Sequence, residues 1–90
     1  MIEISKHAHR QWRRRSDTPG LDLRLAWVLG VVLDGIEEFD EGRYDHRSET
    51  VLFRRGTTLV TVYDARDVNA DLQTKINDCR RATEIGRAHV

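Results

Sequence analysis

The sequence predicts an α+β domain in which two N-terminal helices precede a three- to four-stranded antiparallel sheet and a C-terminal helix. Three observations support this prediction. Apolar residues recur at helical spacing in the first third of the chain, apolar and polar residues alternate over residues 50–64, and helical spacing returns from Val68 onward. The chain has 90 residues, enough for one hydrophobic core. We therefore expect one α+β domain at residues 1–67, with a C-terminal helix and tail at residues 68–90.

The N-terminal segment predicts a short strand and then a helix. Ile2–Ile4 alternates apolar and polar residues, as a strand does. Ser5 is a good helix N-cap, because a serine hydroxyl accepts a hydrogen bond from an amide of the first turn. We expect the helix to cover Lys6–Arg15, with Ala8 and Trp12 on one face because they are four residues apart.

A second helix is expected after the break at residues 16–20. Either Thr18-Pro19 or Asp22 can start it, and Gly35 is a plausible C-cap after a helix that runs to about Leu33. An alternative is a buried strand from Trp27 to Leu33. The apolar stripe predicts that this helix is the main one packed on the sheet, and it consists of Leu25, Val28, Leu29, Val32 and Ile36.

The next part of the chain predicts strands. Residues 43–47 form a candidate first strand, and residues 50–55 and 57–64 form a hairpin with Arg55-Gly56 at its turn. In this register Val51 faces Val60. The expected core face carries Val51, Phe53, Val60 and Val62. The expected half-polar face carries Leu52, Arg54, Leu59, Thr61 and Tyr63.

The C-terminal segment predicts a helix with a narrow apolar stripe, formed by Val68, Leu72, Ile76, Cys79 and Ala82. Asp67 or Asn69 can cap its start, and Gly86 is expected to end it, with a frayed tail beyond. We expect the stripe to dock on the domain. The alternatives are a homodimer through the C-terminal helix or contact with another partner.

Several classes of protein are excluded by composition. The longest apolar run is the nine residues Leu25–Leu33, far short of the ~20 residues of a membrane span, and the N-terminus does not resemble a secretory signal. Cys79 is the single cysteine, so we expect a cytoplasmic protein with no disulfide within the chain. His7 and His9 are two residues apart, which does not suit a helical metal site, and we expect no metal and no cofactor.

The net charge is zero, but the charges are segregated. Residues 6–15 hold five cations and no acid, whereas residues 34–41 hold five acids and no cation. Among the basic residues only Lys6 and Lys75 are lysine. A guanidinium group matches phosphate oxygens and stacks on bases, although a GC-rich genome produces the same bias toward arginine. We therefore predict that the basic stretch binds RNA.

Cleavage of RNA through the ribose 2′-hydroxyl suits this set of residues. That reaction needs a base for the hydroxyl proton and cations for the phosphate, but no metal. In the expected register Arg54 and Tyr63 share the half-polar face of the sheet. The predicted RNA-binding residues around them are Lys6, Arg13, Arg15, His46 and Arg66.

The order of the elements, and the segment Ile4-Ser5-Lys6-His7-Ala8 followed by Arg10 and Arg14, resemble the ribonuclease-toxin superfamily of RelE, BrnT, barnase and the tRNA-cutting colicins. Within it, the start is similar to an uncharacterised "SKHA…R…R" group, and Thr61–Tyr63 resembles that group's closing strand. The resemblance covers about residues 2–66. It implies a toxin with an antitoxin partner, or a relative that has lost activity. By position it implies a catalytic set of His7, Arg10, Arg14, Arg54 and Tyr63.

Three hypotheses follow from the sequence. The first is a metal-independent ribonuclease of toxin type. The second is a non-catalytic module that binds nucleic acid or a protein through the basic N-terminal helix. The third is a self-assembling protein that uses the C-terminal stripe.

Overall fold

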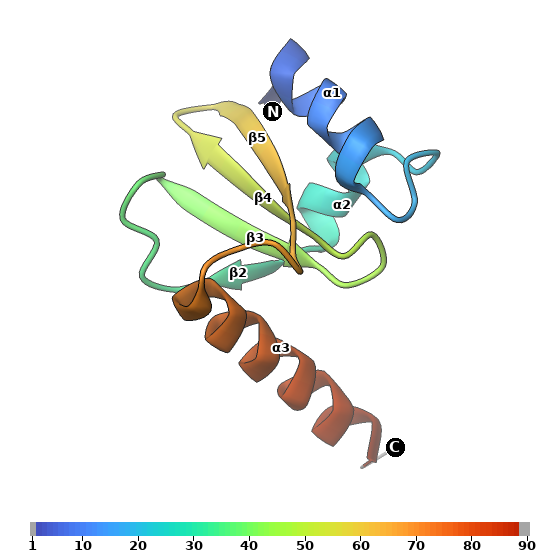
Figure 1. Ribbon diagram of the computed structural model, residues 1–90, viewed down its shortest axis with the longest axis vertical. Coiled ribbons are helices and arrows are strands. Elements are labelled where there is room, and N and C mark those ends of the chain that lie inside the picture. Colours follow the sequence, from blue (N-terminus) through green and yellow to red (C-terminus); the bar gives the residue numbers. More distant parts are fainter. Residues whose placement is uncertain (1, 89–90) are drawn as a thin grey trace.

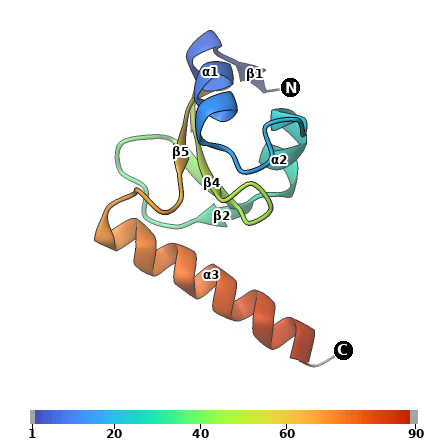
Figure 2. The same ribbon diagram turned by 45° about the vertical axis from the view of Figure 1, so that its right-hand side comes forward.

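A central sheet separates three helices into two layers. The computed structural model describes residues 2–88, and the side chains of residues 2–81. Helices α1 (Lys6–Arg15) and α2 (Leu23–Leu29) lie on one side of the sheet, and α3 (Ala70–Ala88) lies on the other (Figure 2). The predicted α+β class is confirmed.

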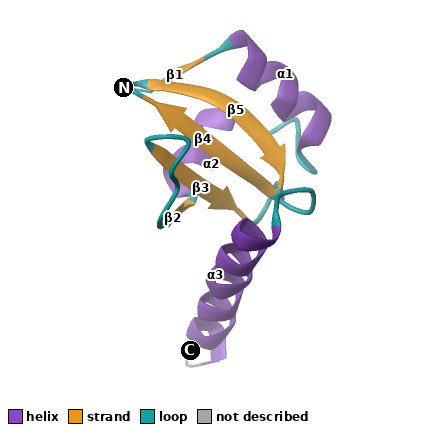
Figure 3. Ribbon diagram, turned by 60° about the vertical axis from the view of Figure 1, so that its left-hand side comes forward, coloured by secondary structure: helices purple, strands orange, loops and turns teal. Residues whose placement is uncertain are grey.

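The sheet has five strands in the order β1-β5-β4-β3-β2. Figure 1 shows β5, β4, β3 and β2, and Figure 3 also labels β1 beside β5. They are β1 (Glu3–Ile4), β2 (Val31–Leu33), β3 (Glu41–Asp45), β4 (Thr50–Arg55) and β5 (Thr58–Asp64). Strand β1 pairs with β5 in parallel, and the other neighbours are antiparallel. The prediction of a three- to four-stranded antiparallel sheet was therefore wrong, because the two short edge strands enlarge the sheet and β1 makes it mixed.

Helix α1 forms as its sequence predicts. The Ser5 side chain caps it by accepting a hydrogen bond from the Ala8 amide at 3.0 Å. Ala8 and Trp12 are buried against the sheet, and the Trp12 indole donates to the Leu21 carbonyl at 3.1 Å. One face of the helix is thereby fixed on the sheet, and the other faces solvent.

Helix α2 is shorter than predicted. Asp22 caps its start by accepting from the Arg24 amide at 2.9 Å, but the helix ends at Leu29 with Gly30 as its C-cap. The predicted end near Leu33 and the predicted C-cap at Gly35 were wrong. Residues 31–33 instead pair with β3, so the alternative of a strand was correct for this part. A β-carbon at Gly30 would lie only 3.0 Å from a backbone oxygen of α2, so the chain leaves the helix at a residue without a side chain.

The predicted apolar stripe of this region is mostly exposed. Leu25, Val28, Leu29 and Val32 keep between 46% and 65% of their surface accessible. The residues that α2 buries are Leu23, Ala26 and Trp27. The stripe prediction was wrong because α2 packs through the face that carries Leu23, Ala26 and Trp27, which turns Leu25, Val28 and Leu29 to solvent, and because the helix stops at Gly30. The apolar side chains beyond it belong to an edge strand.

The predicted hairpin is present, but its register differs. Val51 pairs with Tyr63 rather than with Val60. The predicted turn at Arg55-Gly56 was wrong, because Arg55 pairs with Thr58 and the turn is Gly56-Thr57, which shifts the register by two residues. The irregularity next to Phe53, which skips Val60, shifts it by one more. Both faces of the hairpin are consequently buried. Leu52, Leu59 and Val62 face α1 and α2, whereas Val51 and Phe53 belong to the core on the α3 side.

Helix α3 docks on its own sheet, as expected. Ile76 is fully buried in the second core, and Val68, Leu72 and Cys79 pack against that core. Asn69 caps the helix by accepting from the Leu72 amide at 2.9 Å. The predicted end at Gly86 was wrong, because the helix runs to Ala88. The predicted contact of Ala82 lies outside the residues whose side chains are described.

A polar cluster also holds α3 to the sheet. Arg80 donates to the Tyr44 hydroxyl at 3.1 Å and to the Glu49 carboxylate, and Tyr44 donates to the same carboxylate at 3.2 Å. Burial raises the pKa of Tyr44, so the phenol stays protonated as a donor at neutral pH.

Within residues 2–88, no helix is long and apolar enough to cross a lipid bilayer.

Candidate nucleic-acid interface

The solvent face of α1 carries a cluster of basic side chains. Because Ala8, Gln11 and Trp12 are buried toward the sheet, the opposite side of the helix points away from it. The exposed basic residues of this face are Lys6, His7, His9, Arg10, Arg13 and Arg14. Arginines in the last turn also offset the partial negative charge at the helix C-terminus, so the cluster stabilises the helix that carries it.

Part of this face forms a depression of about 410 Å³. Its lining consists of His7, Arg10, Gln11, Arg13 and Arg14, and it includes no acidic residue. Among the residues that the structure describes, these three arginines have no ion pair, since the seven pairs involve other side chains. We call this surface the α1 depression. It presents three guanidinium groups that are available to an anion.

Gln11 was not among the residues that the sequence singled out. Its side chain is only 9% exposed, and its Oε1 atom has no hydrogen-bond partner among the described residues. The sequence did contain a signal. Gln11 is three residues from Ala8 and adjacent to Trp12, so a polar side chain occupies the apolar face of the helix.

Arg15, another predicted RNA-binding residue, lies toward the sheet rather than on the solvent face of α1. Its guanidinium donates to the Val62 carbonyl at 3.0 Å and lies 5.1 Å from the ring centroid of Tyr63. Arg15 is three residues beyond Trp12, which brings it to the sheet side of the helix. At the other end of α1, the Ser5 hydroxyl donates to the Val60 carbonyl at 3.2 Å. Both ends of α1 are thus fixed to the edge of β5.

Arg54 and Tyr63 do not share a face of the sheet, which corrects the predicted arrangement. Arg54 lies 3.4 Å from the Glu41 carboxylate, its ion-pair partner on the next strand. Tyr63 pairs with Val51 and packs edge-on against Phe53, with ring centroids 5.6 Å apart. The irregularity at Val60 changes the alternation along β5 and separates the two side chains.

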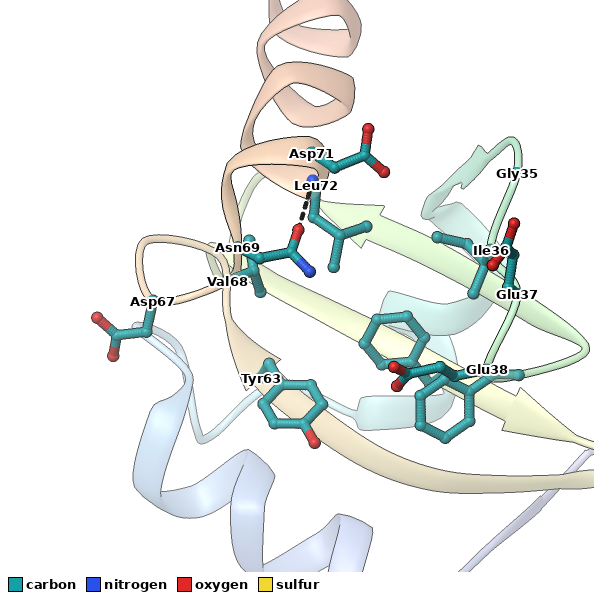
Figure 4. Close-up of a pocket in the computed structure, with 12 residues that line it drawn as sticks. Gly35, Ile36, Glu37, Glu38, Tyr63, Asp67, Val68, Asn69, Asp71 and Leu72 are labelled. Carbon is teal, nitrogen blue, oxygen red and sulfur yellow. Dashed lines mark hydrogen bonds between the residues drawn. The ribbon is translucent and has the colours of Figure 1, made fainter.

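Tyr63 lines a second cavity, of about 480 Å³, on the α3 side of the sheet (Figure 4). Stacked Phe39 and Phe53, with ring centroids 4.5 Å apart, also line it. No lysine or arginine contributes to this lining, whereas four acids do: Glu37, Glu38, Asp67 and Asp71. The acidic segment of the sequence therefore borders Tyr63, and this cavity is unsuited to a phosphate group.

The remaining two predicted RNA contacts lie in loops. Arg66 is neutralised by Asp17, at 2.6 Å, and by Asp64, at 2.9 Å. The hydrogen bond from Arg66 lowers the pKa of Asp64 below its usual value. His46 is exposed in the turn after β3. That turn is connected to the end of α1, because the Asp17 amide donates to the Ser48 carbonyl at 2.9 Å.

Comparison with known protein families gives a match to the part of the chain that contains α1. The family model Halo_toxin, described as "Putative RelE superfamily toxin domain", matches residues 4–66, about 70% of the chain. The chain belongs to this family. No curated protein and no solved structure matches significantly. The matched part of this RelE superfamily toxin domain includes the whole of α1 and all of β2 to β5, and it ends before α3.

The basic face of α1 thus lies within the part of the chain that matches the toxin family. In the described part of the toxin domain, no three His, Cys, Asp or Glu side chains are grouped as a metal site requires. The groups available for chemistry in the α1 depression are the imidazole of His7, the amide of Gln11 and the guanidinium groups.

Proposed function

We propose that this toxin domain is a metal-independent ribonuclease that binds RNA phosphates in the α1 depression and cleaves the chain through a ribose 2′-hydroxyl. The observation that carries the proposal is the group of three arginines without ion pairs around His7 in one depression. Arginine is the side chain best suited to hold a phosphodiester, because its planar fork donates two parallel hydrogen bonds to phosphate oxygens.

In the proposed reaction, His7 accepts the proton of the 2′-hydroxyl, and the resulting oxygen attacks the adjacent phosphorus. The bond from phosphorus to the 5′-oxygen breaks, and that oxygen takes up a proton. The products end in a 2′,3′-cyclic phosphate and a 5′-hydroxyl. Arg10 and Arg14 neutralise the charge that develops on the phosphate. Lys6, Arg13 and His46 extend the contact along the RNA.

We further propose an antitoxin protein as the partner of the domain, since toxins of this kind act in pairs with one. Arg54 and Tyr63 have no place in the proposed catalytic group, because Arg54 is paired with Glu41 and Tyr63 borders the acidic cavity. Arg15 is engaged by the Val62 carbonyl and Arg66 by Asp17, so neither is assigned to the proposed site.

A non-catalytic RNA-binding module is the second candidate. One observation favours it. The α1 depression has a single proton-transfer group, His7, because arginine does not lose its proton in proteins. The proton for the leaving 5′-oxygen would have to come from water, or from His7 after its imidazole has moved toward that oxygen.

The test is incubation of the purified chain with RNA in EDTA. Cleavage to 2′,3′-cyclic phosphate ends is expected, with loss of activity in His7→Ala and a fall of about 10²-fold or more in Arg10→Ala and Arg14→Ala. His9→Ala is the matched control, because His9 is exposed on the same helix but does not line the depression.

Binding without cleavage by the wild-type chain would select the second candidate. The slope of log K against log salt should then change by about 0.7 for each arginine removed, as expected for one phosphate contact on a single strand. RNA that is neither bound nor cut would refute both functions.

A further inference from the structure

The floor of the α1 depression contains a polar group that the proposed chemistry does not use. Gln11 is 9% exposed, whereas the other residues that line the depression are exposed. Its Oε1 atom is buried and has no hydrogen-bond partner in the described part of the chain. A buried acceptor without a donor lowers stability, and an apolar side chain of similar size would avoid that cost.

The surrounding charges indicate what a ligand has to supply. A phosphodiester is held by the arginines, but it has no donor for an amide oxygen. The backbone of DNA has none either. The ribose 2′-hydroxyl is a donor, it lies next to the phosphate, and it is the group by which proteins distinguish RNA from DNA. The amide at the end of a glutamine turns easily about its last torsion, so Oε1 can be directed at a ligand above it.

We propose that Gln11 accepts a hydrogen bond from a ribose 2′-hydroxyl and makes the α1 depression selective for RNA over DNA. This inference rests on the proposed function, since it presupposes that the depression binds a nucleic acid. The hydroxyl at the cleaved bond gives its proton to His7. Gln11 is one helical turn, about 6 Å along the axis, from His7. It therefore takes the 2′-hydroxyl of the neighbouring nucleotide.

The experiment measures binding, so that it does not depend on turnover. His7→Ala and His7→Ala/Gln11→Met chains are titrated into labelled RNA and into DNA of the same sequence, in EDTA at one fixed salt concentration. A denaturing gel confirms that the RNA stays intact. A third probe is the RNA with a single 2′-deoxy nucleotide at each position in turn.

We expect the His7→Ala chain to bind RNA about five- to tenfold more tightly than DNA, the effect of one hydrogen bond. One 2′-deoxy position should remove most of that preference. The Gln11→Met change should bring RNA and DNA affinities within twofold, by weakening RNA binding while DNA binding stays the same. An unchanged preference in Gln11→Met, with both polymers still bound, would overturn the inference and leave the proposed function standing.

Failure of the proposed function has a different signature, because neither polymer would then bind. Gln11→Met should unfold at the same or a higher urea concentration than the parent, since methionine fills the site without an unsatisfied acceptor. A second variant, Gln11→Glu, keeps an acceptor. It should retain the preference for RNA while it binds both polymers more weakly, and loss of the preference in this variant would also count against the inference.

Discussion

The docking of α3 on the sheet can be tested at Ile76. This side chain is fully buried in the second core, and its replacement by alanine removes three carbon atoms from a packed site. Such changes lower the free energy of unfolding by about 2–5 kcal/mol. A chain of this length has a total stability of roughly 5–13 kcal/mol, so Ile76→Ala should remain folded but with much less stability. Thr74→Ala is the control, because Thr74 is exposed on the same helix.

The assay is urea unfolding followed by tryptophan fluorescence. Both Trp12 and Trp27 lie in the first core, on the opposite side of the sheet from Ile76. A shift in their transition therefore shows that the loss at α3 is transmitted through the sheet. With a slope of about 1–3 kcal/mol per molar urea, the midpoint should fall by about 0.7–5 M, and Thr74→Ala should shift it little. Equal midpoints for the two variants would refute the packing of α3 on this sheet.

Two further predictions concern the sheet and its loops. In Gly42→Ala the new β-carbon would lie 3.0 Å from the ring of buried Phe53, so we expect a loss of about 1–3 kcal/mol in the free energy of unfolding. The control is Gly20→Ala, whose β-carbon meets nothing within 4 Å and which should lose no stability. Equal losses for the two variants in urea unfolding would contradict the prediction. Arg66 lowers the pKa of Asp64 below 3.8, so the stability that this ion pair contributes is present above about pH 4 and is lost as the pH falls through the folded-state pKa. In an acid titration followed by circular dichroism, Asp64→Asn should lose its folded structure with a shallower dependence on pH than the parent chain. Identical profiles for the two chains would refute this prediction.

Local signals in the sequence were sufficient for some elements. Ser5 and the spacing of Ala8 and Trp12 predicted α1 with the correct ends, because its cap and its buried face lie within eleven residues. The end of α2 was not predictable in the same way. Residues 31–33 form a strand because they pair with residues 42–44, and a helical pattern that continues by chance past Gly30 does not reveal that pairing.

In the candidate site, too, some features follow from local sequence signals and others depend on pairings that are not visible in the sequence. The basic face of α1 follows from the sequence, because helical geometry alone separates it from Trp12. The faces of Arg54 and Tyr63 depend on a single irregularity at Val60, which no local pattern shows. One partner of Arg66 was also hidden, since Asp17 is 49 residues away in the chain.

Strand β4 belongs to both cores at once, with Leu52 on one side and its neighbours Val51 and Phe53 on the other. This arrangement has a consequence for how the gene can vary. Deletion or insertion of one codon within β4 would exchange the side chains of the two cores, so such alleles should be purged. The open loop at Gly20 can lengthen or shorten at little cost. Reading-frame-preserving indels among relatives should therefore accumulate at that loop and avoid β4.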